Sequence, residues 1–298
     1  MPQLTAYLAA DGFLPQLLEE LGASVSEVCG NLVLATGSGA PAAWAANVWH
    51  EPKHIPIVSI GDAAKKLRAI QRNWALYSFA HYRRAALIVG QLPRVSAKPL
   101  VFGAPPPSAP LGSFTLIAPD MVLASPACSS SFPNGEVKFV EDLSAPSRAY
   151  LKLWELFTVI GERPRPGELC LDLGSSPGGW TWVLQGLGTS VLSVDKAPLD
   201  PRVAGLAGVV QRQESAFALD PRKVGRVDWL FSDVVCYPKR LMGLVQKWLQ
   251  AGNVRCFVCT LKFQGATDFA AMHAFAAIPG SRLLHLHHNK HELTWIRL

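Results

Sequence analysis

Several features that would place this chain in a particular class of protein are missing from its sequence. It contains no run of about 18 apolar residues, so a transmembrane helix is not expected. A basic segment ahead of an apolar core, the mark of a secretory signal, is missing from its first residues, so we expect a cytoplasmic protein. Charged residues make up only 17% of the chain and hydrophobic residues 49%, which is typical of a globular protein and excludes a disordered one.

Cysteine is also scarce, and its spacing argues against disulfides and metal binding. The six cysteines are spread thinly, and several lie in apolar runs, as buried reduced thiols do. Cys256 and Cys259 form one C-x-x-C pair inside a predicted strand, where residues three apart face opposite ways, and no second pair exists. The histidines between 285 and 291 have no fixed ligand geometry, so the sequence predicts no metal site.

The dinucleotide fingerprint G-x-G-x-x-G is absent too, which argues against a nicotinamide-dependent dehydrogenase. Another nucleoside-binding pattern is present. A short buried strand, a glycine-rich turn and the start of a helix are predicted within LCLDLGSSPGGW, residues 169–180. Asp195 ends the next predicted strand, 23 residues after Asp172, where its carboxylate can accept hydrogen bonds from ribose hydroxyls. The pattern favours an adenosyl ligand without a pyrophosphate.

From residue 145 to the end, predicted strands and helices alternate, as a doubly wound α/β sheet requires. The predicted strands are 169–173, 190–194, 208–212, 227–232, 254–261, 283–287 and 293–297. The last two flank a polar stretch and predict an antiparallel hairpin at the sheet edge.

Charged residues stand at the ends of these strands, where open α/β sheets bind ligands. Asp233 and Lys262 each follow an apolar strand, Glu292 opens the last strand, and Lys152 lies on the helix before the first strand. A lysine at the end of a strand, beside a second lysine, would have its pKa lowered by like charge and by desolvation, so that its amine can take a proton from a hydroxyl group or stabilise an alkoxide.

This order of segments resembles the FtsJ-like ribose 2′-O-methyltransferases, and within them the RlmM-type enzymes that methylate a cytidine ribose of large-subunit ribosomal RNA. The likeness is carried by APSRAYLKLWE (145–155), DLGSSPGGWTWVLQ (172–185), SVDKAPL (193–199), SDVVCYPKRLMGLVQKWL (232–249) and LKF (261–263). It covers essentially all of residues 145–298. It implies a Rossmann-like methyltransferase sheet whose active site is a Lys-Asp-Lys-Glu tetrad, here Lys152, Asp233, Lys262 and Glu292.

The same resemblance implies a set of residues that bind S-adenosyl-L-methionine. The glycine turn would hold the methionine part, Asp195 the ribose and Glu214 the adenine, while Asp233 lines the cofactor near its methyl group. The family usually has Asp where Glu214 stands, so the adenine contact either shifts by a methylene or falls on a neighbouring residue. It usually has a small polar residue where Ala149 stands, so that contact is either lost or moves to Ser147. The full expected set is Ser147, Asp172, Gly174, Ser176, Pro177, Gly178, Gly179, Trp180, Asp195, Glu214 and Asp233.

Residues 1–144 predict a separate, smaller part of the chain. We expect a small α+β module over 1–95, with strands at 3–9 and 31–35 and helices near 12–23, 41–49 and 62–70. Five prolines between 99 and 110 then predict a linker with short strands over 96–144. This part resembles, more weakly, the ferredoxin-like and THUMP-like RNA-binding region of the family.

A basic segment within this part favours RNA binding, because cations neutralise phosphates and rings stack on bases. Its cations are Lys65, Lys66, Arg68, Arg72, Arg83, Arg84, Arg94 and Lys98, interleaved with Trp74, Tyr77, Phe79 and Tyr82. The alternative is an amphipathic helix with a solvated basic face and an aromatic core face.

The sequence therefore predicts S-adenosylmethionine-dependent 2′-O-methylation of a ribose in RNA, with large-subunit (23S) ribosomal RNA as the expected substrate. A monomer is the favoured state. The alternative from another class is a catalytically idle RNA-binding protein that retains the fold. The tetrad argues against that alternative, because binding alone does not require two lysines and a glutamate at separate strand ends.

Overall fold

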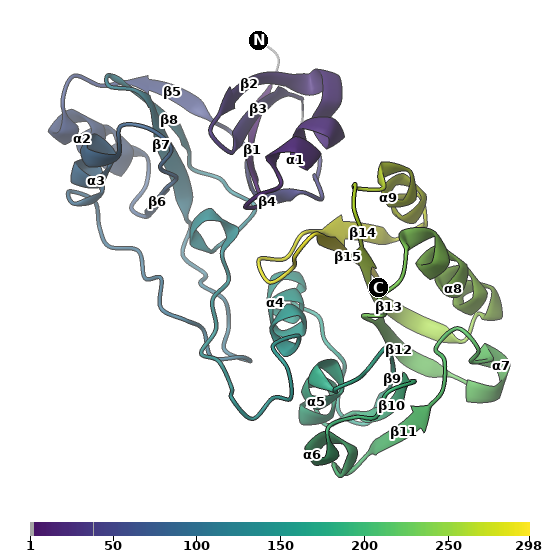
Figure 1. Cartoon of the computed structure of the whole chain (residues 1–298). Helices are drawn as coiled ribbons and strands as arrows, with labels where there is room; N and C mark the ends of the chain where they lie inside the picture. Colours follow the sequence, from purple (N-terminus) through teal and green to yellow (C-terminus); the bar gives the residue numbers. More distant parts are fainter. Residues whose placement is uncertain (1–2, 38) are drawn as a thin grey trace. The chain divides into compact units, whose positions relative to one another are not determined.

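The computed structural model describes residues 3–37 and 39–298, and the chain divides into two compact units, one ending at Val140 and one from Glu141 to Leu298. Each unit is drawn with its elements in Figure 1. Among the described residues, no helix combines the length and the hydropathy needed to cross a membrane.

The N-terminal unit contains two four-stranded sheets. The first has the order β2-β3-β1-β4 and is accompanied by one helix and one short 3₁₀ turn. Its elements are β1 (Leu4–Ala9), α1 (Leu14–Leu21), η1 (Gly22–Ser24), β2 (Val25–Cys29), β3 (Leu32–Thr36) and β4 (Ala45–Trp49). The helix expected over 41–49 is wrong, because residues 45–49 pair with the free side of β1, and that tertiary pairing overrides local propensity.

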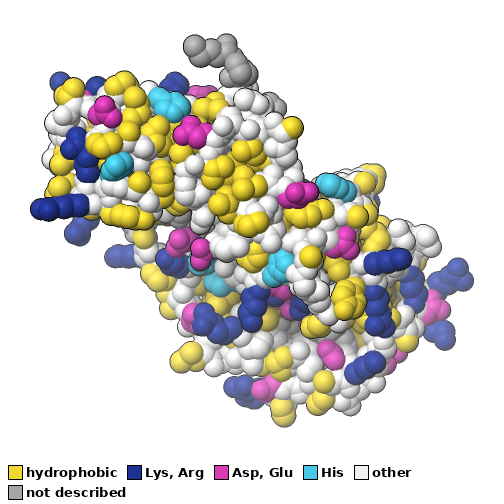
Figure 2. Space-filling model, turned by 45° about the horizontal axis from the view of Figure 1, so that its top comes forward, with side chains coloured by type: hydrophobic (Ala, Val, Ile, Leu, Met, Phe, Trp, Pro, Cys, Tyr) yellow, Lys and Arg dark blue, Asp and Glu magenta, His cyan; other side chains and the backbone are white. Residues whose placement is uncertain are grey.

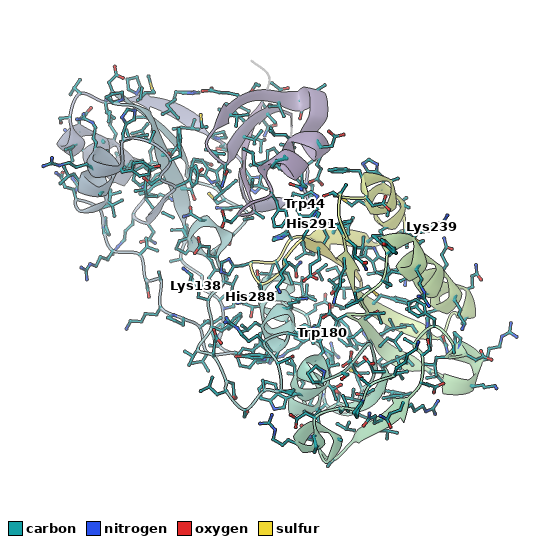
Figure 3. All side chains as sticks on the ribbon, in the orientation of Figure 1. Trp44, Lys138, Trp180, Lys239, His288 and His291 are labelled. Carbon is teal, nitrogen blue, oxygen red and sulfur yellow. The ribbon has the colours of Figure 1, made fainter. Side chains whose placement is uncertain are left out.

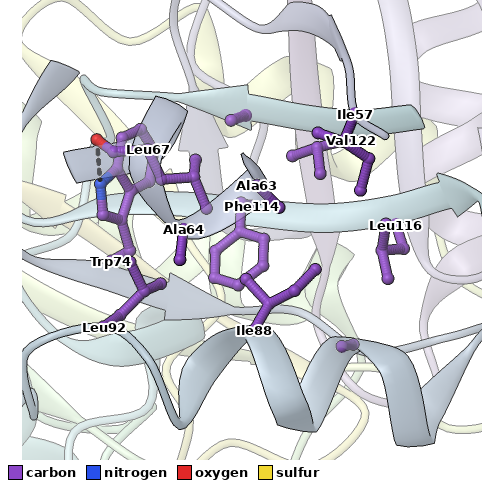
Figure 4. Close-up of a cluster of buried hydrophobic side chains, with 12 residues drawn as sticks. Ile57, Ala63, Ala64, Leu67, Trp74, Ile88, Leu92, Phe114, Leu116 and Val122 are labelled. Atoms are coloured by element: carbon purple, nitrogen blue, oxygen red, sulfur yellow. Dashed lines mark hydrogen bonds between the residues drawn. The ribbon is translucent and has the colours of Figure 1, made fainter. Parts of the chain in front are cut away.

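The second sheet has the order β5-β8-β7-β6. Its elements are β5 (Lys53–Pro56), α2 (Ile60–Ile70), β6 (Trp74–Leu76), α3 (Tyr82–Val89), β7 (Gly112–Ala118), β8 (Met121–Ser125) and η2 (Pro133–Gly135). The apolar faces of α2 and α3 pack on this sheet around Phe114 and Trp74, which are 0% and 3% exposed (Figure 4). The ring of Trp74 belongs to this core, as the amphipathic alternative predicts, but Trp74 lies on strand β6 and not on a helix.

The predicted boundary near residue 95 does not separate two parts of this unit. Strand β7 pairs with β6, and β8 pairs with β5, so the segment expected to be a linker supplies the two central strands of the second sheet. The proline-rich stretch between α3 and β7 is an irregular connection within the unit. Strand pairs this far apart in sequence leave no local pattern that a single segment reveals.

The C-terminal unit is a mixed α/β domain with a seven-stranded sheet of order β11-β10-β9-β12-β13-β15-β14. Strands β11, β10, β9, β12 and β13 run parallel, β15 runs antiparallel to β13, and β14 runs antiparallel to β15. The elements are α4 (Tyr150–Ile160), β9 (Leu169–Leu173), α5 (Gly179–Gly186), β10 (Ser190–Asp195), α6 (Pro201–Ala204), β11 (Val209–Gln213), α7 (Pro221–Val224), β12 (Val227–Ser232), α8 (Pro238–Ala251), β13 (Val254–Lys262), α9 (Phe269–Ala276), β14 (Ser281–Leu284) and β15 (Glu292–Arg297).

Candidate active site

The topology of the seven-stranded sheet brings the predicted charged residues to one edge. Strands β9, β10, β12 and β13 are parallel, so the residues that follow them lie at the same edge of the sheet. Because β15 runs the opposite way, its first residue lies at that edge as well. Lys262, the last residue of β13, is the cross-strand partner of Glu292, the first residue of β15.

The four residues of the predicted tetrad form one connected cluster. Lys152 Nζ lies 2.5 Å from Glu292 Oε1 and 3.4 Å from Asp233 Oδ1. Lys262 Nζ lies 3.0 Å from the same Asp233 oxygen and donates a hydrogen bond of 2.7 Å to the Asp233 carbonyl oxygen. Asp233 thus stands between two ammonium groups, and Glu292 holds one of them.

These charged groups are largely shielded from solvent, with side chains between 8% and 18% exposed. Burial by itself lowers the pKa of Lys152, but the charges of Asp233 and Glu292 outweigh it and raise that pKa above its ordinary value. The two carboxylate partners of Lys152 keep it a cation at neutral pH.

The glycine turn between β9 and α5 lies at the same sheet edge. Gly174 adopts a φ of +78°, and a Cβ atom there would come within 2.9 Å of the Val234 backbone, next to Asp233. A Cβ atom on Gly179 would meet Ser147 Oγ at 2.5 Å, so Ser147 lies against this turn. Ser147 Oγ is buried and has no hydrogen-bond partner among the described residues. The turn thus places a buried polar atom, Ser147 Oγ, beside Gly179.

Asp195 connects the end of β10 to this turn. Its carboxylate accepts hydrogen bonds from the backbone N–H of Ser176 at 3.1 Å and of Ala197 at 2.9 Å. Glu214 directly follows β11, and Gln213 is the register partner of Asp195. The structure therefore places the two predicted acids for ribose and adenine on adjacent strand ends. The side chain of Glu214 is 40% exposed and lies 4.0 Å from the Arg212 guanidinium.

Four residues of the predicted cofactor set are buried: Asp172, Gly178, Gly179 and Trp180. Trp180 is 4% exposed, and its indole N–H donates to the Ala149 carbonyl oxygen at 3.0 Å. Asp172 is 1% exposed and accepts a hydrogen bond of 2.7 Å from Thr181, whose hydroxyl also contacts Ser193. Each side chain forms a hydrogen bond that holds the residues next to the turn in place. Burial raises the pKa of Asp172 to about 7 against the opposing Thr181 bond, and the charges of Asp233 and Asp195 add to the rise.

The sequence reasoning missed one residue of this region, Glu155. This glutamate is 2% exposed on α4, and its carboxylate accepts hydrogen bonds from the loop between β14 and β15. A signal for it exists in the sequence, since Glu155 is the single acidic residue within the otherwise apolar run LWELFTVI. Strand β14 ends at Leu284, before the residues that contact Glu155, so the strand predicted over 283–287 is wrong for its last residues.

The N-terminal unit carries most of its predicted cations on its surface. Lysine and arginine side chains are seen along its outer edge in Figure 2, mixed with apolar ones. Lys66 pairs with Asp62, and Arg68 donates to the Gln91 carbonyl oxygen, so these two are partly used inside the unit. A cavity of about 490 Å³ is lined in part by Arg94, Lys98 and Lys138 together with apolar residues of the proline-rich stretch.

Comparison with known proteins gives matches to methyltransferases. Residues 145–262 match the family model described as FtsJ-like methyltransferase. The chain is 40% identical over 134 residues to ribosomal RNA large subunit methyltransferase M of Halorhodospira halophila, covering 44% of this chain and 39% of that protein. The protein of the same name from Thauera aminoaromatica is 30% identical over 190 residues, which cover 58% of this chain and 52% of the relative.

The chain spans about half or less of the length of these curated relatives. Among solved structures, a ribosomal RNA methyltransferase from Plasmodium falciparum matches with a TM-score of 0.39 and 16% identity, over 51% of this chain and 96% of that one.

Proposed function

We propose that this chain transfers a methyl group from S-adenosyl-L-methionine to the 2′-hydroxyl of a ribose in RNA, because residues 145–262 match the FtsJ-like methyltransferase family model. The observation that carries the proposal is the connected cluster of Lys152, Asp233, Lys262 and Glu292 at the sheet edge that also bears the glycine turn. The relatives named ribosomal RNA large subunit methyltransferase M support 23S ribosomal RNA as the substrate, which would place the activity in the cytoplasm.

The residues around the turn fit an adenosyl cofactor. The sheet edge offers the glycine turn itself, the buried and unpartnered Ser147 hydroxyl beside it, and the carboxylates of Asp195 and Glu214 on neighbouring strand ends. In our proposal Ser176 to Gly179 hold the methionine part, Asp195 holds the ribose and Glu214 holds the adenine. The cofactor supplies an electrophilic methyl group on a sulfonium centre.

In the proposed mechanism, the tetrad prepares the ribose oxygen for in-line attack. Asp233 holds Lys262 Nζ through both its carboxylate and its carbonyl oxygen, so the ammonium group is fixed in place. The Lys262 ammonium stabilises the negative charge that develops on the ribose oxygen as the hydroxyl proton leaves to solvent. If Lys262 first loses a proton to solvent, its neutral amine takes the hydroxyl proton directly. Lys152 remains protonated and pairs with both Asp233 and Glu292. These two ion pairs hold the charged groups in fixed positions.

The N-terminal unit is proposed to bind the RNA substrate. Its exposed cations Lys65, Arg72 and Arg83 lie on or next to α2 and α3, outside the core that these helices form with the second sheet. Positive side chains on one outer surface neutralise phosphates without reading sequence. The resemblance to ferredoxin-like and THUMP-like RNA-binding regions supports this role.

The alternative, an idle RNA-binding protein with a methyltransferase fold, has no observation in its favour. Burying four charged side chains together costs desolvation free energy, and in an idle protein these side chains would serve no reaction. Isothermal titration with S-adenosylmethionine separates the two, because an idle module has no need to bind it.

The decisive test is Lys262→Ala, assayed with tritiated S-adenosylmethionine and 23S ribosomal RNA that lacks ribose methylation. We expect kcat to fall by about 100-fold or more, since a preorganised charge at the reacting oxygen is removed, while cofactor affinity persists. Lys223→Ala removes an exposed lysine from α7 and serves as the control for charge. Ribose methylation retained by Lys262→Ala would refute the assignment.

A further inference from the structure

A carboxylate is buried in the C-terminal unit one helical turn away from Lys152. Glu155 lies on α4 among apolar residues, and its side chain is 3% exposed. A buried carboxylate is costly unless hydrogen bonds replace its water. Here Oε1 accepts from the His287 backbone N–H at 2.6 Å, while Oε2 accepts from the His288 backbone N–H at 3.0 Å and from His288 Nδ1 at 2.6 Å.

All three donors belong to the loop between β14 and β15, which leads directly into Glu292. This loop runs past α4 in Figure 1, and Figure 3 shows His288 beside that helix. Beyond His288 the loop is closed by its own hydrogen bonds. Asn289 donates from its backbone to Leu286 at 2.9 Å and from its side chain to Thr294 at 3.1 Å, and the Glu292 backbone N–H donates to Lys290 at 2.8 Å. Fixing His287 and His288 therefore fixes the start of β15.

Helix α4 thus contacts the end of the sheet twice. Lys152 and Glu155 are three residues apart and lie on the same side of the helix. Lys152 binds the Glu292 side chain, and Glu155 binds the loop four to five residues before it. We propose that Glu155 is a positioning residue, which together with His288 locks the β14–β15 loop so that Glu292 meets Lys152 in the geometry needed for methyl transfer. This inference rests on the proposed function of the tetrad.

The chemistry of the three donors requires a carboxylate at this position. Both oxygens of Glu155 accept hydrogen bonds, whereas a carboxamide offers one oxygen and turns N–H groups toward the other donors. In Glu155→Gln at least one N–H of His287 or His288 loses its acceptor, which costs free energy and displaces the loop. A shift of the loop moves Glu292 away from Lys152 but leaves Asp195 and the glycine turn untouched.

The first experiment separates kcat from KM in Glu155→Gln. We expect kcat for RNA methylation to fall by about 10- to 100-fold, because a misplacement of about 1 Å has an effect of that size. KM for S-adenosylmethionine should stay within about twofold of the wild-type value. An unchanged kcat would overturn the proposal, whether or not the thermal midpoint falls.

Glu168→Gln is the matched control. Glu168 also accepts three hydrogen bonds, from Arg165 N–H at 2.9 Å, Trp229 Nε1 at 2.9 Å and Arg255 at 2.6 Å. It directly precedes β9 and so lies at the opposite edge of the sheet from the tetrad. The same chemical change there should alter stability and leave kcat unchanged.

A second pair of variants changes the donor in place of the acceptor. His288→Ala removes the ring N–H that reaches Glu155, and we expect it to lower kcat about 10-fold. His288→Asn returns an N–H donor near the position of Nδ1 and should recover most of that loss. Equal activity of the two variants would show that the hydrogen bond to Glu155 does not position the loop.

Hydrogen exchange tests the proposal without methyl transfer. In Glu155→Gln we expect faster amide exchange in the peptide covering 285–292, and no change there in Glu168→Gln. If the wild-type chain transfers no methyl group to RNA, the proposed function fails, and the exchange result still decides the role of Glu155. An unchanged exchange rate over 285–292 in Glu155→Gln would overturn the inference even in an active enzyme.

Discussion

At the scale of single residues, the C-terminal unit places its buried charges in two different settings. The tetrad pairs each carboxylate with an ammonium group, so its charges compensate one another. Asp172 lies beneath the glycine turn with one oxygen bound to Thr181 and the other, Oδ1, without a partner among the described residues. That difference explains why burial raises the pKa of Asp172 to about 7.

Asp172 makes the stability of the fold depend on pH. Its pKa is higher in the folded than in the unfolded state, so the folded state is favoured at low pH, and this advantage is lost as the pH rises from about 4 to about 7. Asp172→Asn keeps a neutral group at every pH. We expect the free energy of unfolding of this variant, relative to that of the wild type, to increase by roughly 1–3 kcal/mol between pH 4.5 and pH 8. Urea unfolding at both pH values measures this, and a difference that does not change with pH contradicts it.

At the scale of helices and strands, much of the C-terminal unit could be predicted because its strands are short apolar runs that end in charged residues. The strands before Asp233 and Lys262 follow this pattern, and the order of a parallel sheet then brings their ends together. Local signals of this kind do not exist for β4, whose residues were expected to form a helix, or for the pairing of β6 with β7 across the proline-rich stretch.

Several contacts in the site could not be predicted from the sequence. The burial of Asp172 and Trp180 depends on how α5 packs on the sheet, and the contact of Glu155 with His288 joins residues 133 positions apart. Such contacts are set by tertiary packing, which no periodicity along the chain reports.

The turn between β9 and α5 gives a prediction at this scale. Gly174→Ala adds a Cβ atom at a φ of +78° and within 2.9 Å of the Val234 backbone, beside Asp233. We expect a loss of about 1–3 kcal/mol in the free energy of unfolding, together with weaker binding of S-adenosylmethionine. Chemical denaturation and isothermal titration measure the two effects.

Gly186→Ala is the control for this substitution. Gly186 ends α5, and a Cβ atom there would meet no atom within 4 Å. The change should leave cofactor binding unaltered and raise stability by about 0.5–1 kcal/mol or leave it unchanged. Equal losses in Gly174→Ala and Gly186→Ala would show that the close approach at Gly174 is not what shapes the turn.

At the scale of the whole molecule, the division into two units has a direct consequence for the chemistry. In the part of the chain that the structure describes, each of the three sheets takes its strands from one unit only. The tetrad, the glycine turn and Glu155 all belong to the unit from Glu141 to Leu298, which has its own core and a length typical of a domain. Cofactor binding and RNA binding should therefore be separable.

A fragment comprising residues 141–298 tests this separation. We expect it to unfold cooperatively and to bind S-adenosylmethionine with a Kd within about threefold of that of the full chain, because every proposed cofactor contact is retained. Its kcat/KM for RNA should fall at least about 10-fold and depend less steeply on salt concentration, since the cations around α2 and α3 no longer neutralise phosphates. Calorimetry, titration and methylation assays at two salt concentrations measure these quantities. A fragment that methylates RNA as efficiently as the full chain would show that the N-terminal unit does not recruit the substrate.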